Sequence, residues 1–70
     1  MHELKPFFFT FVQKHPLRDY WIEIHAPDDE LARFEMVDLF GRKWAFQYDD
    51  ADFKPEYYPK GRLGDVIEVL

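Results

Sequence analysis

The chain has 70 residues, no cysteine and a formal net charge of −5. This length predicts one domain over residues 1–70, with a small core that gains stability from a second copy of the chain. The lack of cysteine excludes disulfides and thiolate metal sites. The acidic balance argues against general DNA or RNA binding, since contacts to a phosphate backbone require a basic surface.

A β-hairpin is predicted at the start of the chain. Residues 7–12 (FFFTFV) are strand formers. Residues 19–26 (DYWIEIHA) alternate between apolar and mixed positions, as a half-exposed strand does. Pro16 marks the turn between them. The two strands are therefore expected to pair antiparallel.

A helix is predicted over residues 28–40. Asp28 or Asp29 can cap its N-terminus, and Gly41 follows its last apolar residue, where a glycine can end a helix. At about 100° per residue, the apolar positions of this helix fall in two sectors. The first sector holds Ala32, Met36, Leu39 and Phe40, and the second holds Leu31, Phe34 and Val37.

The second sector has no assigned neighbour within the chain. A helix that covers one face of a sheet buries only one sector, and an exposed apolar patch often marks an interaction site. Two arrangements stay open for Leu31, Phe34 and Val37. Either they are buried against a second copy, which makes the protein a homodimer, or the tail of the chain covers them.

An aromatic strand follows the helix, because Trp44, Phe46 and Tyr48 alternate with Ala45 and Gln47. Its aromatic face either packs against the helix as core or offers a stacking surface to a planar ligand. The remaining segments are predicted as a capped helical turn at 49–53, a proline- and glycine-rich loop at 54–64 and a last strand at 65–70.

Together these elements predict an α+β fold of order β-β-α-β-β, with a four-stranded, mainly antiparallel sheet and one helix on one face. The other face carries Trp21 and Phe8, and it is expected to be solvated or to form the dimer surface. No run of residues is long enough to span a membrane. The apolar run 7–12 is too short for the core of a signal peptide.

Catalysis and metal binding are not expected. His2, His15 and His25 are too far apart in sequence to suggest a metal site. Thr10 is the only serine or threonine, so the usual nucleophiles are nearly absent. We therefore predict a non-enzymatic protein without a metal or other cofactor.

Cations and aromatic residues in the predicted loops give a candidate binding site. Arginine offers a planar, bidentate fork to phosphate, and tyrosine or tryptophan offers a face on which a base can stack. If the loops converge, these residues form a pocket for a small anionic, nucleotide-like ligand; otherwise they are solvated surface charges. The candidate ligand-binding residues are His15, Arg18, Arg42, Lys43, Trp44, Tyr48, Tyr57, Tyr58 and Arg62.

Four parts of the chain resemble a group of small accessory proteins encoded in tailed-phage genomes. They are His15-Pro16, the helix residues Ala32, Arg33 and Met36, the run FGRKWAFQY at 40–48, and YYPKG at 57–61. The pattern FG-x-KW-x-x-QY is the most specific part of this resemblance, which extends over nearly the whole chain. It implies a viral protein that acts in the cytoplasm of a bacterial host.

For such a protein the resemblance suggests an anti-defence role. One route is to act as a sponge that sequesters a nucleotide immune signal, such as a cyclic ADP-ribose derivative. The alternative is an acidic inhibitor or nucleic-acid mimic that binds a host defence protein through the carboxylates of residues 28–30 and 49–52. A structural, virion-associated role is a third hypothesis. The first two differ in the side chains that matter, arginines for the sponge and carboxylates for the inhibitor.

Overall fold

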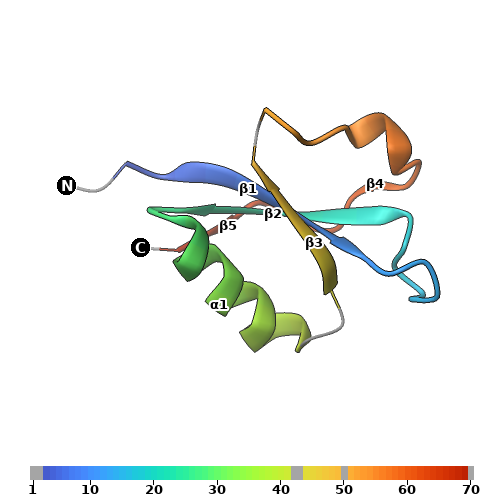
Figure 1. The fold of residues 1–70 in the computed structure, drawn as a ribbon, viewed down its shortest axis with the longest axis horizontal. Helices are drawn as coiled ribbons and strands as arrows, with labels where there is room; N and C mark the ends of the chain where they lie inside the picture. Colours follow the sequence, from blue (N-terminus) through green and yellow to red (C-terminus); the bar gives the residue numbers. More distant parts are fainter. Residues whose placement is uncertain (1–2, 42–43, 50, 70) are drawn as a thin grey trace.

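The computed structural model describes residues 3–41, 44–49 and 51–69. The predicted α+β class and β-β-α-β-β order are confirmed, with one further short strand inside the predicted loop. The helix α1 covers one face of the sheet, and the segment after β3 passes over the other face (Figure 1). The elements are β1 (Lys5–Phe11), β2 (Tyr20–Ala26), α1 (Asp29–Phe40), β3 (Trp44–Asp49), the 3₁₀ turn η1 (Pro55–Tyr57), β4 (Gly61–Arg62) and β5 (Ile67–Glu68).

The sheet has the strand order β3-β1-β2-β4, and β5 also pairs with β2. β1 is antiparallel to both β2 and β3, as predicted for the hairpin. β4 and β5 instead run parallel to β2, so the sheet is mixed where the sequence predicted a mainly antiparallel one. The cause is the path of the chain: from the edge strand β3 it crosses two strands to reach the opposite edge, and such crossovers produce parallel neighbours.

α1 begins and ends where the sequence predicts. The carboxylate of Asp28 accepts a hydrogen bond from the amide of Leu31 at 2.8 Å, as an N-cap residue does. Gly41 stops the helix with a φ of 69°, a value that glycine adopts without strain, and its amide donates to the Val37 carbonyl. None of the described helices is long and apolar enough to cross a membrane.

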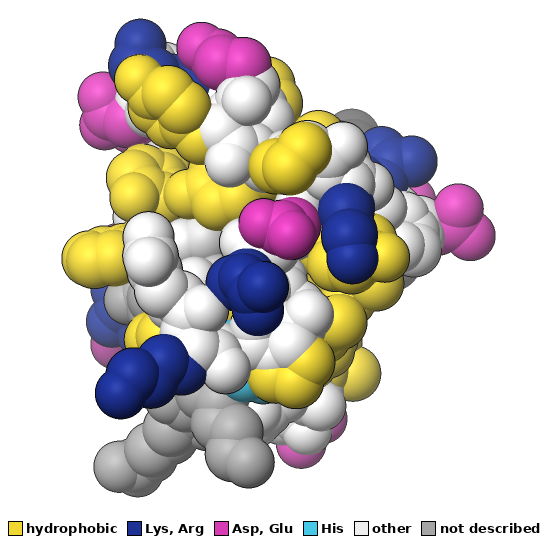
Figure 2. All heavy atoms as spheres, turned by 90° about the vertical axis from the view of Figure 1, so that its right-hand side faces the viewer, with side chains coloured by type: hydrophobic (Ala, Val, Ile, Leu, Met, Phe, Trp, Pro, Cys, Tyr) yellow, Lys and Arg dark blue, Asp and Glu magenta, His cyan; other side chains and the backbone are white. Residues whose placement is uncertain are grey.

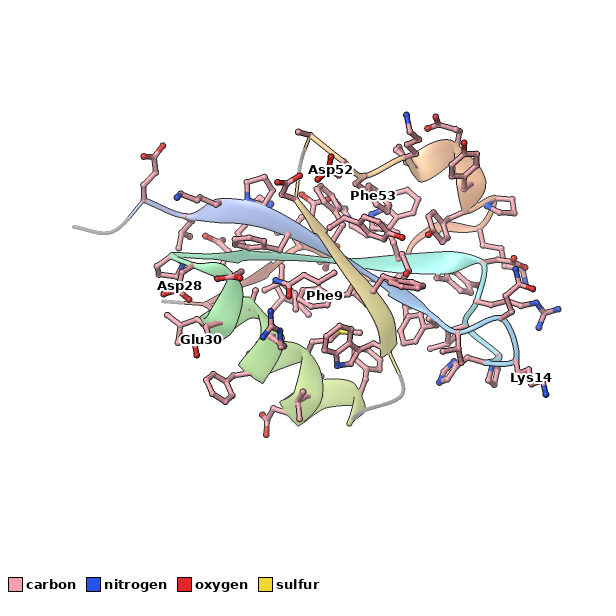
Figure 3. All side chains as sticks on the ribbon, viewed as in Figure 1. Phe9, Lys14, Asp28, Glu30, Asp52 and Phe53 are labelled. Carbon is pink, nitrogen blue, oxygen red and sulfur yellow. The ribbon has the colours of Figure 1, made fainter. Side chains whose placement is uncertain are left out.

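The core lies between α1 and the sheet, and Figure 3 shows Phe9 in this layer. Phe9 lies opposite Ile22 across β1 and β2, and Phe7 lies opposite Ile24. These pairs place an aromatic ring beside a β-branched side chain, which is a favourable cross-strand combination. The buried cluster comprises Phe7, Phe9, Phe11, Ile22, Ile24, Ala26, Ala32 and Met36.

The outer side of α1 stays exposed in the described chain. Phe34 is 67% exposed, and Leu31 and Val37 are also exposed. The prediction that the tail covers them is wrong, because the tail pairs with β2 through β5 instead. Leu39, which was expected in the core, is 50% exposed, since the buried side of the helix is centred on Ala32. Burial of this surface against a second copy stays a prediction.

The aromatic residues of β3 are divided between the two faces of the sheet. The odd-numbered residues of β1 form the core, so Thr10 and its partner Phe46 lie on the face away from α1, as does Tyr48. A register shift after Thr10 then places Trp44 opposite Phe11, on the helix side. The prediction of a single aromatic face is therefore wrong, because an irregularity in the ladder breaks the period of two.

Candidate functional site

The segment between β3 and β4 covers the helix-free face of the sheet with aromatic rings. Phe53 stacks on Phe8 with ring centroids 4.5 Å apart and planes 2° apart. It meets Trp21 at 5.3 Å in an edge-on arrangement and stacks on Tyr58 at 5.6 Å. Figure 3 shows Phe53 on the opposite side of the sheet from Phe9. The expectation that this face is solvated or is a dimer surface is wrong, because the chain covers it with its own side chains.

A turn after β3 directs this segment back over the sheet. The Asp49 carbonyl accepts hydrogen bonds from the amides of Asp52 and Phe53 at 3.3 and 3.2 Å. The Asp49 carboxylate also accepts from the Asp52 amide at 3.0 Å. Aspartate favours turns through this kind of bond to the following backbone. The predicted helical turn at 49–53 is therefore a capped turn that brings Phe53 over β1.

The rings of Phe8, Trp21, Phe53 and Tyr58 form an aromatic cluster on this face of the sheet. Beside this aromatic cluster, next to the hairpin turn, lies an open hollow of about 690 Å³. Its walls come from β1, β3, the hairpin turn and the residues around η1. Two aromatic side chains of its lining project into solvent, Phe46 at 61% and Tyr57 at 71% exposure. Exposed rings at the edge of a concave surface are suited to stacking with a planar ligand.

Five of the nine predicted ligand-binding residues line this hollow, namely Arg18, Trp44, Tyr48, Tyr57 and Tyr58. They come from the hairpin turn, from β3 and from the last loop, which the strand order brings together. The ring of Trp44, however, packs on the core side and meets Phe9 edge-on at 5.3 Å. The side chains left for a ligand are therefore Arg18 and the tyrosines.

Two other predicted residues, His15 and Arg62, are not part of the lining and have partners of their own. The ring nitrogen Nδ1 of His15 accepts a hydrogen bond from the Leu17 amide at 3.0 Å, and its ring stacks on Phe11 at 4.7 Å. The guanidinium of Arg62 lies 3.5 Å from the Glu23 carboxylate on β2. The structure thus does not bring His15 or Arg62 to the lining of the hollow.

Arg42 and Lys43, the last two predicted residues, lie outside the described residues. Among the described lining of the hollow, Arg18 is the single full cation and Asp19 is the single carboxylate. Lys60 lies 5.7 Å from the centre of the Tyr20 ring. Figure 2 faces this end of the molecule and shows Lys and Arg side chains scattered between apolar areas. The described part of the lining is therefore suited to one anionic group rather than to a chain of phosphates.

Tyr48 lies between the aromatic cluster and the hollow, with its ring 6.0 Å from Phe53. Burial raises the pKa of the Tyr48 hydroxyl above its ordinary value of 10.0, and the neighbouring Tyr58 hydroxyl raises it further. The phenol is therefore neutral at physiological pH. In that form it can both donate and accept a hydrogen bond toward a ligand.

A second open hollow lies where β1 begins, β3 ends and α1 begins. Several of its carboxylates already have local partners: Asp28 caps the helix, and Asp29 lies 3.8 Å from the Arg33 guanidinium. The described residues contain no group of side chains able to hold a metal ion. The charged residues that line this hollow are Lys5, Asp28, Asp29, Arg33, Asp49 and Asp52.

Comparison with known proteins found no family model that matches the chain, and no match among curated proteins or solved structures. The resemblance to small tailed-phage proteins accordingly stays an expectation drawn from the sequence pattern.

Proposed function

We propose that this protein is a non-enzymatic binding protein that captures a small nucleotide-like ligand in the hollow beside Tyr48. The observation that supports this most is the convergence of Arg18 with Tyr57, Tyr58 and Phe46 around one concave surface. Aromatic faces stabilise a stacked base, and an arginine can hold a phosphate through two parallel hydrogen bonds. The hollow thus offers both elements of nucleotide recognition.

The proposed ligand carries one phosphate at Arg18. Asp19 is adjacent in sequence and lines the same hollow, so a second phosphate there would meet a like charge. A cyclic ADP-ribose-like signal, the ligand suggested by the phage resemblance, would keep one of its two phosphates toward solvent. The described lining therefore favours a nucleoside monophosphate over a polyphosphate.

The biological role that we propose is that of an anti-defence sponge in the cytoplasm of a bacterial host. A sponge acts by mass action: it lowers the free concentration of a signal without converting it. Such a role needs no nucleophile or acid–base pair, in agreement with the poor supply of hydroxyl and thiol nucleophiles in the chain. The predicted homodimer is part of this proposal.

Calorimetric titration with AMP, adenosine and cyclic ADP-ribose tests the site. We expect AMP to bind more tightly than adenosine, because adenosine lacks the group that Arg18 holds. Arg18→Ala should weaken AMP binding about 10- to 100-fold, since hydrogen bonds to charged groups contribute about 1.5–3 kcal/mol. The same variant should leave adenosine binding unchanged.

Lys14→Ala is the matched control, because Lys14 is an exposed cation at the tip of the same hairpin turn (Figure 3). It should change the affinity for neither AMP nor adenosine. If Lys14→Ala weakens AMP binding as much as Arg18→Ala does, the effect is one of net charge and the proposed site is wrong. If none of the three probes binds the wild-type protein, nucleotide capture is wrong.

An acidic protein inhibitor or nucleic-acid mimic is the second candidate. It is favoured by one observation: the two acidic stretches meet, since Asp28, Asp29, Asp49 and Asp52 line a single hollow. Binding of a basic partner there should weaken steeply with added salt. The double variant Asp28→Asn/Asp29→Asn, which keeps a capping side chain at position 28, should lose a captured host protein while Arg18→Ala retains it. The opposite pattern would contradict this candidate.

A further inference from the structure

We propose that a second copy of the chain pairs with the free edge of β3, so that two sheets join into one across a two-fold axis. β3 lies at one edge of the sheet, and among the described strands it pairs only with β1. An edge strand presents a row of unpaired N–H and C=O groups to which another strand can bind. In the described chain, the carbonyl of Asp49 is the one β3 backbone group with a backbone bond outside this pairing.

The two edges of the sheet differ in their protection against pairing. At the opposite edge, β4 and β5 have two residues each. Very short edge strands are a common protection against contact with another sheet. β3 has six residues and carries neither proline nor a charged side chain at positions 44–48. Positions 46–48 of β3 therefore lack the proline, the charge and the short length that usually block strand addition, and the irregularity in its ladder with β1 is confined to its Trp44 end.

A second copy is the occupant that this strand complements best. In an antiparallel pair centred on Phe46, each Phe46 lies opposite its copy on the same face of the joined sheet. Phe46 is 61% exposed in the single chain, with its ring 6.2 Å from Tyr48. Pairing would place the partner subunit's Phe46 beside this ring and bury part of its exposed surface. The net charge of −5 opposes association of two copies, and the uncharged stretch 44–48 adds no like-charge contact to that repulsion.

The same axis places the two helices on one face of the joined sheet, with their β3 sides toward each other. Arg33 marks that side of α1, because its Nε donates to the Gln47 side chain on β3 at 3.2 Å. Val37 lies one turn further along the same side and is 36% exposed. A helix face of three apolar side chains alone falls far below the ~800 Å² per partner of a stable interface. The interface that we propose is therefore formed by the paired β3 strands with Val37 beside them, whereas Phe34, about 100° further around the helix than Arg33, lies outside it.

Pairing also changes the candidate ligand site. Phe46 lines the hollow, so Phe46 of the partner subunit would border the same hollow from its open side. Each site would then contain an aromatic ring from both copies. This consequence rests on the proposed ligand site, whereas the strand pairing itself does not.

Two opposite charges at position 46 test the interface. Sedimentation velocity over a range of concentrations should show a dimer for the wild type and monomers for Phe46→Glu and for Phe46→Lys, because like charges would face each other across the axis. An equimolar mixture of F46E and F46K should form a dimer again, since a carboxylate then faces an ammonium group. Circular dichroism should show that both variants keep the fold, because the side chain they replace is exposed.

Phe34→Glu is the matched control, since it makes the same change at an exposed phenylalanine on the helix. It should leave the dimer intact. Three results would overturn the proposal: a wild-type monomer at all concentrations, loss of the dimer in F34E but not in F46E, or an F46E–F46K mixture that stays monomeric. Because the oligomeric state is measured without ligand, failure of the nucleotide proposal would leave this test unaffected.

Discussion

Phe53 is the residue on which the helix-free side of the sheet depends most. Its ring contacts those of Phe8, Trp21 and Tyr58 and lies near that of Tyr48. A buried Phe→Ala change costs about 3–5 kcal/mol. Because Phe53 is only half-buried, we expect Phe53→Ala to lower the free energy of unfolding by about 2–3 kcal/mol. For a domain of this size that lowers Tm by about 10 °C or more.

Thermal and urea denaturation can measure this loss, with Tyr57→Ala as the control. Tyr57 belongs to the same segment but is 71% exposed, so its replacement should change stability by no more than about 0.5 kcal/mol. Equal effects of the two substitutions would show that Phe53 does not hold the segment to the sheet.

The sequence does not indicate that Phe53 packs against the sheet. Phe53 stands alone between an acidic turn and a loop containing Pro55 and Pro59, so no hydrophobic period marks it as core. Its burial follows from the crossing of the chain over β1 and β2, a non-local feature of the strand order. Arg18 and Tyr57 were identified from their residue types, but their meeting in one hollow depends on the same crossing.

At the scale of elements, short stretches of sequence were sufficient to predict those helices and strands that depend on residues close to each other in the chain. Asp28 and Gly41 mark the ends of α1 within a residue, because capping chemistry acts on the backbone next to it. The hairpin of β1 and β2 follows from two apolar runs and one turn. The faces of β3 could not be predicted in this way. A register shift against β1 moves Trp44 to the helix side, and the alternation of residues within β3 does not reveal that shift.

The cap of α1 offers a test at this scale. Asp28→Ala removes the acceptor of the 2.8 Å hydrogen bond from the Leu31 amide, so we expect a loss of about 1 kcal/mol in the free energy of unfolding. Asp28→Asn keeps a side-chain oxygen at the same place and should stay close to the wild type. Urea denaturation measures both variants. A loss of similar size in Asp28→Asn would assign the effect to the negative charge rather than to the cap.

At the scale of the whole molecule, the fold has two aromatic layers, one on each side of a single sheet. α1 covers one layer, which contains Phe9, and the segment between β3 and β4 covers the other layer through Phe53 (Figure 3). Both layers are thin, since a chain of 70 residues buries only about 60% of its unfolded surface. A second copy at β3 would add buried area that the single chain cannot supply.

Pairing of two copies at β3 makes the thermal stability of the protein depend on its concentration. A dimer that forms only from folded chains stabilises the folded state by mass action, by about 2.7 kcal/mol when the partner is at 100 times its Kd. Scanning calorimetry of the wild type should therefore show a Tm that rises with protein concentration. F46E, in which the two-fold contact is blocked, should show a lower Tm that does not change with concentration. A wild-type Tm that is independent of concentration would contradict the proposed pairing, and an equal rise in F46E would assign the stabilisation to association through some other surface.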